Sequence, residues 1–290
     1  MTDGARYAAL TFGIRPPVGN HLRPNFGHAV DSNLLILLTA VNYVNATGDF
    51  SWWDQHQNQL AQLYANTLSF RDNSGLIVQP ENSDWQDSVS RTGKTFYTNI
   101  LFFAVSQRLP FSKIDLSALR RQINFTFFDS GTQLYRSIEG SSFISLDGIL
   151  LAIDLDYVSE TDALLLYESL KIHPLWTSPT GPGFVTYPNY PIAWVAVGPQ
   201  LYGLRHYHDE MYWSWLMGLS AKIARKMGDA SSADRIFDRL QKMAVRDSTI
   251  AEIYSPIHDL PPFHSFLYHS EQPFSWGAGM ILDALHDDGK

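Results

Sequence analysis

Cysteine is absent from this chain of 290 residues. Disulfide bonds, thiolate metal sites and cysteine nucleophiles are therefore excluded. Charge is also scarce, because 17% of the residues are charged whereas 45% are hydrophobic. A chain of this length and composition buries a large core, which excludes intrinsic disorder.

Basic residues are too few to suggest a nucleic-acid interface. Lys and Arg number 21 against 29 Asp and Glu, which gives a formal net charge of -8 at pH 7. No run of basic residues occurs, and phosphate-rich partners would be repelled by the net charge. A neutral ligand such as a sugar is compatible with this balance.

Long apolar segments are missing as well. The longest one, residues 34–44, contains Asn42 and Tyr43 and is far too short to span a bilayer. The first ten residues hold no apolar core of the kind found in signal peptides. We therefore expect a cytoplasmic protein without a membrane partner, in which the Asn-X-Thr sequons at Asn45 and Asn124 are chance matches.

Aromatic residues are what the sequence has in excess. They make up 13% of the chain and include 8 Trp and 14 Tyr, many of them beside carboxylates or in loops with Gly and Pro. Flat apolar sugar faces stack on aromatic rings, while sugar hydroxyls bind carboxylates and amides. Aromatic rings also fill protein cores, so their placement decides between the two uses.

Helical hairpins are predicted along most of the chain, because apolar segments alternate with amphipathic ones. This alternation is typical of inner and outer helices, and Gly-Asp turns after Thr47 and Met227 indicate an internal repeat. The pattern predicts an all-α fold, an α/α barrel that forms a single catalytic domain over residues 1–290. The expected helices are residues 31–46, 60–68, 95–108, 116–128, 143–157, 162–172, 211–227, 231–243 and 274–285. Ser231 is expected to cap the helix that ends at Met243.

Two segments do not fit a regular barrel. A six-hairpin barrel needs more helices than the four hairpins and last inner helix counted here, so residues 1–30 would supply a reduced first hairpin or an N-terminal extension. A truncated barrel and a piece of a longer enzyme both remain open. Residues 174–203, rich in Pro, Gly, Trp and Tyr, are too long for a simple connection. We expect them to cover the barrel mouth, with a purely structural loop as the alternative.

A first group of candidate catalytic residues lies in the segment Ser-Asp-Trp-Gln-Asp at residues 83–87. A general acid needs a carboxyl whose pKa is raised by an apolar neighbour or by another carboxylate. Trp85 and the pair Asp84 and Asp87 supply both. The alternative is a helix N-terminus with acids that favour its dipole.

A second carboxylate is needed to activate water in hydrolysis with inversion. Glu252 is a candidate, although a loop acid on the surface is the alternative reading. The segment His-Tyr-His-Asp-Glu-Met-Tyr-Trp-Ser-Trp at residues 206–215 offers aromatic rings and acids for a sugar. His206 and His208 are spaced like a metal pair on a strand, but no third ligand has suitable spacing, so we predict no metal.

Three further acids stand where apolar helices are expected to begin. Glu271, before Pro273, is either a helix-dipole acid or a substrate contact. Asp31 and Asp147 would cap helices by default. No Gly-rich phosphate loop and no Gly-X-Ser-X-Gly elbow is present, so no cofactor is predicted.

In order along the chain, these segments resemble those of one group of α/α-barrel glycosidases. The group comprises the amylo-α-1,6-glucosidase domain of glycogen debranching enzymes and its α-glucosidase and mannosylglycerate-hydrolase relatives. His-Ala-Val-Asp at 28–31, Trp-Gln-Asp at 85–87, Tyr-His to Trp-Ser-Trp at 207–215, Ala-Glu-Ile at 251–253 and Gln-Pro-Phe-Ser-Trp at 272–276 are similar to its motifs. The likeness covers roughly residues 25–285, without the family's N-terminal sugar-binding domain.

The resemblance implies an inverting glycoside hydrolase for an α-linked gluco- or manno-configured glycoside. Asp87 would be the general acid, with Asp84 as a competitor for that role, and Glu252 the general base. The two side chains would face each other across one aromatic-walled pit. Substrate contacts would come from Asp31, Asp84, Trp85, Arg91, Lys94, Asp147, Tyr207, His208, Trp213, Trp215, Glu271 and Trp276.

Two other functions remain open. A sugar epimerase on an α/α barrel would use His residues for proton transfer, and this chain has 10 His, among them His206, His208, His264 and His269. A carbohydrate-binding protein without activity is the other alternative, motivated by the reduced N-terminal helices. In each case the partner is a small-molecule or oligosaccharide ligand, and a homo-oligomer is left open.

Overall fold

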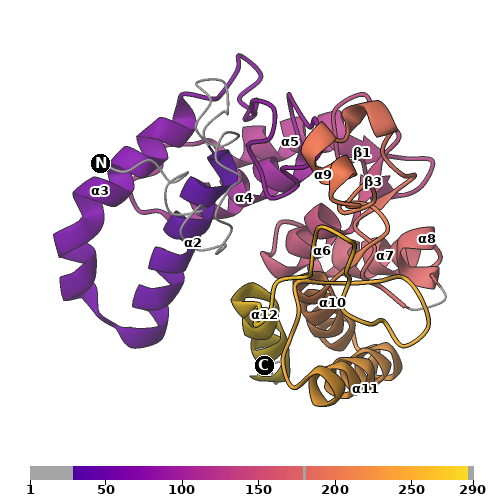
Figure 1. The fold of residues 1–290 in the computed structure, drawn as a ribbon. Helices are drawn as coiled ribbons and strands as arrows, with labels where there is room; N and C mark the ends of the chain where they lie inside the picture. The colour runs from indigo at the N-terminus through magenta and orange to yellow at the C-terminus, as the bar shows by residue number, and fades with distance from the viewer. Residues whose placement is uncertain (1–28, 179–180, 287–290) are drawn as a thin grey trace. The chain divides into compact units, whose positions relative to one another are not determined.

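The computed structural model describes residues 29–178 and 181–286 (Figure 1). Residues 1–28 of the predicted first hairpin, including the short helix expected near residues 6–12, lie outside this part of the chain. Helices dominate the described residues. None of these helices combines the length and the apolar character that a membrane crossing requires.

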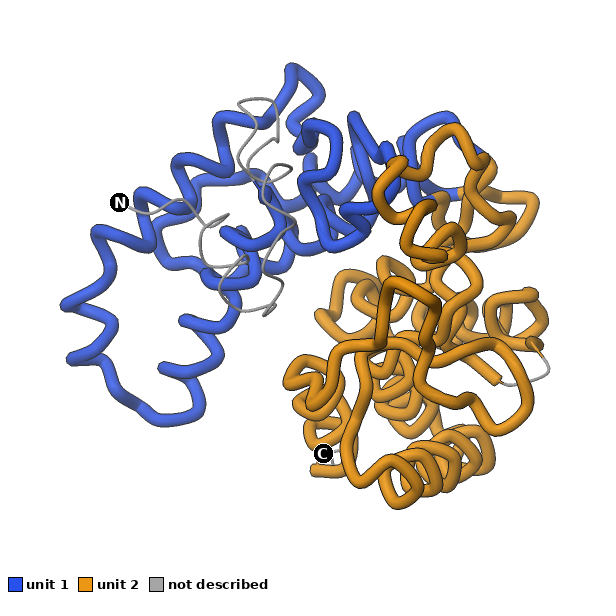
Figure 2. The backbone as a smooth tube through the Cα atoms, in the orientation of Figure 1, with its two compact units in different colours: residues 1–128, 137–141 blue, residues 129–136, 142–290 orange. Residues whose placement is uncertain are grey.

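The chain forms two compact units (Figure 2). Unit 1 consists of residues 1–128 with 137–141, and unit 2 of residues 129–136 with 142–290. Asp87 belongs to unit 1 and Glu252 to unit 2. A single catalytic domain over the whole chain stays a prediction.

Unit 1 contains two pairs of consecutive helices that pack on each other. The first pair is α2 (Val30–Thr47) and α3 (Phe50–Leu68), and the second is α4 (Phe96–Arg108) and α5 (Leu116–Phe127). Every residue of α4 from Phe96 to Ser106 is buried, which fits its continuous apolar sequence. α2 also packs on α4, so the two apolar helices form the core of the unit.

The turn between α2 and α3 follows from two residues. Gly48 adopts the left-handed conformation (φ 70°) that ends helices, and its N–H donates to the carbonyl of Val44 at 2.8 Å. The side chain of Asp49 then accepts from Trp52 N at 2.9 Å and caps α3. The predicted Gly-Asp turn is confirmed at this position.

Unit 2 holds the remaining long helices. They are α6 (Leu146–Asp154), α7 (Glu160–Lys171), α10 (Ser214–Lys226), α11 (Ala230–Asp247) and α12 (Ser275–His286). Helices are thus present in each segment of unit 2 where one was predicted. Two of them, α6 and α10, are shorter than expected, because residues 144–145 and 212–213 form strands at their N-terminal ends.

Short strands join the loops of unit 2. β3 (Ile144–Ser145) pairs antiparallel with β4 (Thr186–Tyr187), and β5 (Tyr212–Trp213) with β6 (Ile253–Tyr254). β1 (Phe128–Asp129) and β2 (Leu134–Tyr135) complete the set described. The segment 174–203 carries β4, the 3-10 helix η1 (Ile192–Trp194) and the short helices α8 (Pro174–Thr177) and α9 (Val197–Leu201).

Three predicted helix caps are wrong. Asp229 rather than Ser231 caps α11, because its side chain accepts from Ser232 N at 3.0 Å. Asp31 lies inside the first turn of α2, whose N-cap is Ala29. Asp147 lies inside the first turn of α6, whose N-cap is Ser145. Both carboxylates are buried, so their placement needs a reason other than capping.

Close packing of α10 on α12 depends on glycine. A Cβ atom added at Gly218 would lie 2.9 Å from backbone atoms of Met280 and Ile281 in α12. An ion-pair cluster joins α10 to α12 and to α6, with Lys222 Nζ 2.9 Å from Asp154 in α6 and 2.7 Å from Asp283 in α12. Only a residue without a side chain permits this approach of the two helices.

We expect Gly218→Ala to lower the free energy of unfolding by about 1–3 kcal/mol, because the added methyl group forces α12 away from α10. Gly279→Ala is the matched control, since a Cβ at that position in α12 meets nothing within 4 Å. It should raise stability by up to about 1 kcal/mol through helix propensity. Urea unfolding followed by circular dichroism measures both, and equal effects would contradict the packing argument.

Candidate functional site

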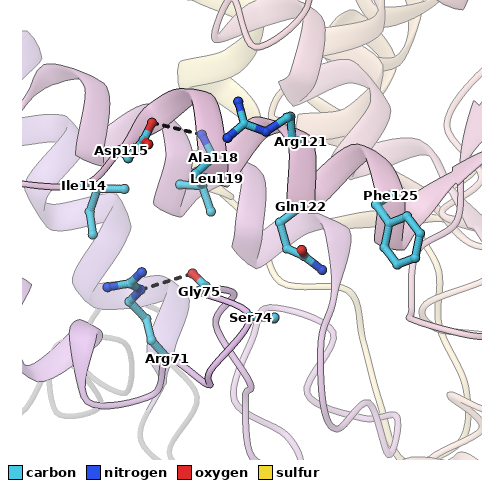
Figure 3. A pocket seen from close by; sticks show the side chains of 10 residues that line it. All are labelled: Arg71, Ser74, Gly75, Ile114, Asp115, Ala118, Leu119, Arg121, Gln122 and Phe125. Carbon is cyan, nitrogen blue, oxygen red and sulfur yellow. Dashed lines mark hydrogen bonds between the residues drawn. The ribbon is translucent and has the colours of Figure 1, made fainter.

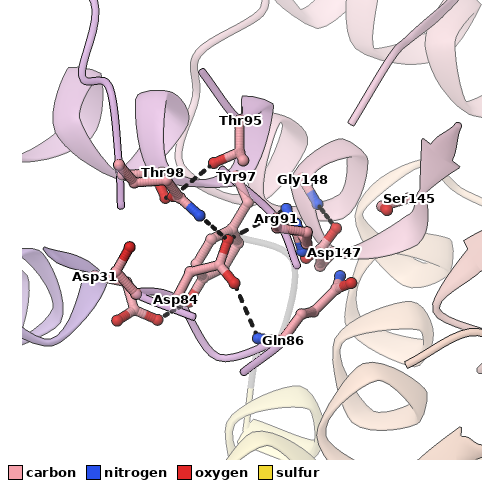
Figure 4. Close-up of polar contacts among 12 residues, drawn as sticks. Asp31, Asp84, Gln86, Arg91, Thr95, Tyr97, Thr98, Ser145, Asp147 and Gly148 are labelled. Atoms are coloured by element: carbon pink, nitrogen blue, oxygen red, sulfur yellow. Dashed lines mark hydrogen bonds and ion pairs between the residues drawn. The ribbon is translucent and has the colours of Figure 1, made fainter. Parts of the chain in front are cut away.

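Three carboxylates gather at one place in unit 1. Asp31 comes from the first turn of α2, and Asp84 comes from the turn-rich segment before α4 (Figure 4). Asp87 belongs to the same segment as Asp84, and its charge acts on Asp31. The two segments are joined because Val30 N donates to Ser83 O at 2.9 Å. The hydroxyl of Tyr97 on α4 donates to Asp31 at 3.4 Å.

Asp84 is held by several donors. Gln79 Nε2 donates to it at 2.8 Å, Gln86 N at 3.0 Å, and Arg91 forms an ion pair with it at 3.4 Å. Both side chains of the ion pair are 1% exposed. The amide oxygen of Gln79 in turn accepts from Thr95 and Thr98 on α4, at 2.9 and 2.5 Å. A buried charge with this many partners is fixed in place.

Asp31 and Asp87 take up protons more readily than ordinary carboxyls. Burial, followed by the charge of Asp84, raises the pKa of Asp31 to about 8. Desolvation by the surrounding protein and then the charge of Asp84 raise the pKa of Asp87 to about 7. Although protein atoms crowd it, Asp87 is exposed at the surface, whereas Asp31 is buried. Asp87 thus combines a raised pKa with access to solvent.

Trp85 and Lys94 are the other residues of unit 1 that were predicted to contact a substrate. Trp85 is 9% exposed, and its ring lies 6.4 Å from that of Tyr97. Lys94 is not among the partners of the cluster, because its Nζ lies 3.1 Å from both Asp72 and Glu139. The alternative of N-terminal acids on α4 does not hold, since that helix begins at Phe96.

Glu252 is at the centre of the candidate site in unit 2. It precedes β6, and its side chain accepts a hydrogen bond from the hydroxyl of Tyr268. Its carbonyl accepts from Ser214 N at 3.0 Å, and its N–H donates to Glu271 O at 2.8 Å. Glu252 is only 3% exposed, so the alternative reading as a surface loop acid is wrong.

A cluster of aromatic rings is linked to this carboxylate through Tyr268. The Trp213 ring lies 4.7 Å from Tyr207 and is stacked on His208 at 5.4 Å. Trp213 Nε1 donates to Tyr207 O at 2.8 Å, and the Tyr207 ring is 6.3 Å from Tyr268. All of these side chains except Tyr268 are buried. The aromatic residues predicted at 207–213 therefore do come together next to the predicted base.

Trp215 and Trp276 form a separate pair. Their rings are stacked at 4.3 Å with Trp215 fully buried, so they join α10 to α12. Glu271 is partly exposed, and burial raises its pKa. Asp147, at the start of α6, is fully buried and accepts from Gly148 N at 2.7 Å.

No metal site is found in the described part of the chain, where no group of three or more His, Cys, Asp or Glu gathers. His206 Nδ1 instead lies 3.0 Å from Asp209. A surface cavity of about 530 Å³ lies in unit 1 between the loop of Arg71 and Gly75 and helix α5 (Figure 3). None of the predicted site residues lines it.

Two functional candidates were missed by sequence reasoning. Gln79 orients Asp84, and Tyr268 donates to Glu252. Gln79 stands four residues before the acidic segment, without any motif to mark it. Tyr268 lies in the same loop as His264 and His269, and no motif marks it as a functional residue.

Solved structures of carbohydrate-active enzymes share the fold. A glycosidase is similar with a TM-score of 0.65 and 15% sequence identity, over 99% of this chain and 77% of its own. A rhamnosidase from Klebsiella oxytoca with rhamnose bound gives 0.60 and 14%, over 87% of this chain and 46% of its own. Cellobiose 2-epimerase from Bacillus thermoamylovorans B4167 gives 0.57 and 11%, over 88% and 71%.

These similarities have a limited meaning. The chain spans about half the length of the rhamnosidase. No protein-family model and no curated protein matches the sequence. At identities of 11–15% the likeness establishes a fold and no activity. The chain therefore has the mostly helical fold that both glycosidases and sugar epimerases of the α/α-barrel type use.

Proposed function

We propose that the protein is an inverting glycoside hydrolase that acts on an α-linked gluco- or manno-configured glycoside. Asp87 protonates the leaving oxygen, and Glu252 takes a proton from the water that attacks the opposite face of the sugar. The observation that carries the proposal is the state of Asp87, a solvent-accessible carboxyl whose pKa is raised to about 7. A general acid must hold its proton near the working pH.

Asp87 suits the acid role better than its two neighbours. Asp84 is bound by Arg91 and Gln79, so its oxygens are engaged by the protein. Asp31 is 4% exposed and lies against Tyr97, which keeps it from the solvent. Asp84 instead supplies the negative charge that raises the pKa of Asp87.

Glu252 suits the base role because its position is fixed. Its backbone is bound on both sides, and Tyr268 donates to its carboxylate. Hydrolysis with inversion requires the acid and base carboxyls to stand about 6.5–9.5 Å apart, with a water between the base and the sugar. This separation is part of the proposal.

The sugar would be held by aromatic and polar side chains. In this proposal Trp85, Tyr207 and Trp213 offer ring surfaces, and the remaining predicted contacts bind hydroxyls or support the site. Those remaining contacts are Asp31, Asp84, Arg91, Lys94, Asp147, His208, Trp215, Glu271 and Trp276. A closed six-hairpin barrel with residues 174–203 over its mouth, the amylo-α-1,6-glucosidase relation and a cytoplasmic location belong to the same proposal.

A sugar epimerase is the second candidate, because the fold is shared with cellobiose 2-epimerase. Such an enzyme would use histidines for proton transfer, and His206 lies beside Asp209 in unit 2. A panel of α-glucosides, α-mannosides and glycerate glycosides, with NMR of the products, separates the two functions. Release of an aglycone with the β-anomer appearing first supports the hydrolase, whereas conversion of a free sugar without release supports the epimerase.

Asp87→Asn and Glu252→Gln should each lower kcat by about 10²–10⁴-fold, because each removes a proton-transfer group. Both substitutions keep the size of the side chain, so circular dichroism and thermal melts should match the wild type. Steady-state kinetics on the substrate identified by the panel measures the effect. Wild-type rates in either variant would refute that residue's assignment.

The pH dependence follows from Asp87. Because the acid must be protonated, kcat/KM should fall as the pH rises above about 7, the pKa of Asp87. Asp84→Asn removes a like charge, which lowers the pKa of Asp87, so the basic limb should move to lower pH. Asp115→Asn, at the N-cap of α5, is a control that leaves the limb in place. A basic limb that stays fixed in Asp84→Asn contradicts the assignment.

A further inference from the structure

A short hairpin fixes the surroundings of Glu252. Ser270 N donates to Phe263 O at 2.8 Å and Ser265 N to Tyr268 O at 2.7 Å, which closes residues 263–270 into a hairpin. Phe263 N donates to Ile253 O at 3.1 Å, so the hairpin is bound to the residue after Glu252. The backbone of the predicted base and this hairpin therefore form one hydrogen-bonded unit.

The tip of the hairpin is also held. Ser265 Oγ accepts from Tyr268 N at 3.1 Å and donates to Tyr202 O at 2.5 Å. Gly203 permits this contact, since a Cβ there would come within 2.9 Å of Ser265 Cβ. The turn that carries Tyr268 is thus held by hydrogen bonds of Ser265, and Tyr268 contacts Glu252 from this turn.

Two tyrosine side chains form a chain of hydrogen bonds that ends at the Glu252 carboxylate. Tyr268 donates to Glu252 Oε2, and Tyr207 forms a hydrogen bond to the Tyr268 side chain. Burial and the charge of Glu252 raise the pKa of Tyr268 well above its usual range, so this hydroxyl keeps its proton and remains a donor. Glu271 is the other carboxylate that acts on Tyr268.

We propose that Tyr268 is the positioning residue of the general base, holding the Glu252 carboxylate in one orientation through its hydroxyl with support from Tyr207. The catalytic part of this role rests on the proposed hydrolase function. The hydrogen bond between Tyr268 and Glu252 is observed independently of that function. A donor to the ionised carboxylate stabilises that form and restricts its side chain. Tyr268 touches Glu252 and acts on the reaction through it.

Loss of the hydroxyl should be visible in the titration of Glu252 itself. Tyr268→Phe keeps the ring and removes the donor, so the pKa of Glu252 should rise by about one to two units. The chain has only seven glutamates, so carbon-13 labelling of the Glu carboxyl groups gives few NMR signals to follow with pH. The signal missing in Glu252→Gln identifies Glu252.

The kinetics should change in a way that a packing defect does not reproduce. In Tyr268→Phe the acidic limb of the pH–rate profile should move to higher pH, and kcat should fall about 10–100-fold while KM changes little. Tyr207→Phe should shift the Glu252 titration in the same direction by less, since it acts through Tyr268. Tyr207→Phe also provides a test of the positioning role if Tyr268→Phe does not fold.

Tyr167→Phe is the matched control. Tyr167 is another tyrosine of unit 2 whose hydroxyl donates to a carboxylate, that of Asp229, at 3.1 Å. Its loss should lower stability and leave the titration of Glu252 and the pH–rate profile unchanged. An unshifted Glu252 signal in both Tyr268→Phe and Tyr207→Phe overturns the positioning role. Full activity in Glu252→Gln instead refutes Glu252 as the base of the proposed hydrolase, whatever the titration shows.

Discussion

The buried ion pair of Asp84 and Arg91 is the constraint on which the candidate acid depends. Both side chains are removed from water, which is costly unless each charge is bound by partners. Gln79 and the backbone of Gln86 supply them for Asp84. Once that charge is fixed, a second carboxylate nearby is ionised less readily. The raised pKa values of Asp31 and Asp87 follow from this arrangement together with desolvation.

The environment of the proposed base, Glu252, is produced by different interactions. Glu252 is placed by backbone hydrogen bonds to Ser214 and Glu271, and its carboxylate is oriented by a neutral hydroxyl. The pKa of the proposed acid is therefore raised by desolvation and by a neighbouring charge, whereas the proposed base is bound by the donor Tyr268. A reaction that needs one carboxyl protonated and the other ionised at the same pH requires such different environments.

Much of the fold was predictable from local sequence patterns. The alternation of apolar and amphipathic segments located α2, α4, α5 and α10 to α12 within a few residues. The helix expected at 60–68 was too short, because α3 already begins at Phe50. The pattern failed where a buried two-residue strand precedes a helix, as at Ile144–Ser145, because apolar residues in strand and helix look alike over so short a stretch. The cap at Asp229 was misplaced by two residues for a related reason, since Asp and Ser are both common N-caps.

The candidate site was predictable only in part. Motifs located Asp84, Asp87 and Glu252, and the aromatic run at 207–213 does gather beside Glu252. Sugar contacts by Trp215 and Lys94 stay predictions, since Trp215 is stacked on Trp276 and Lys94 forms ion pairs with surface acids. Partners such as Gln79 and Tyr268 depend on which loops the fold brings together. A single sequence carries no local signal for such contacts.

Fold similarity alone leaves hydrolase and epimerase chemistry equally open, because the same helical scaffold serves both. Our proposal separates the two by the chemistry of the side chains. His208 is 1% exposed and stacked on Trp213, while His264 and His269 lie exposed on the hairpin that carries Tyr268. In the proposed hydrolase Asp87 is the proton donor and Glu252 the oriented acceptor. This assignment of the two carboxylates is the reason that we propose hydrolysis rather than epimerisation.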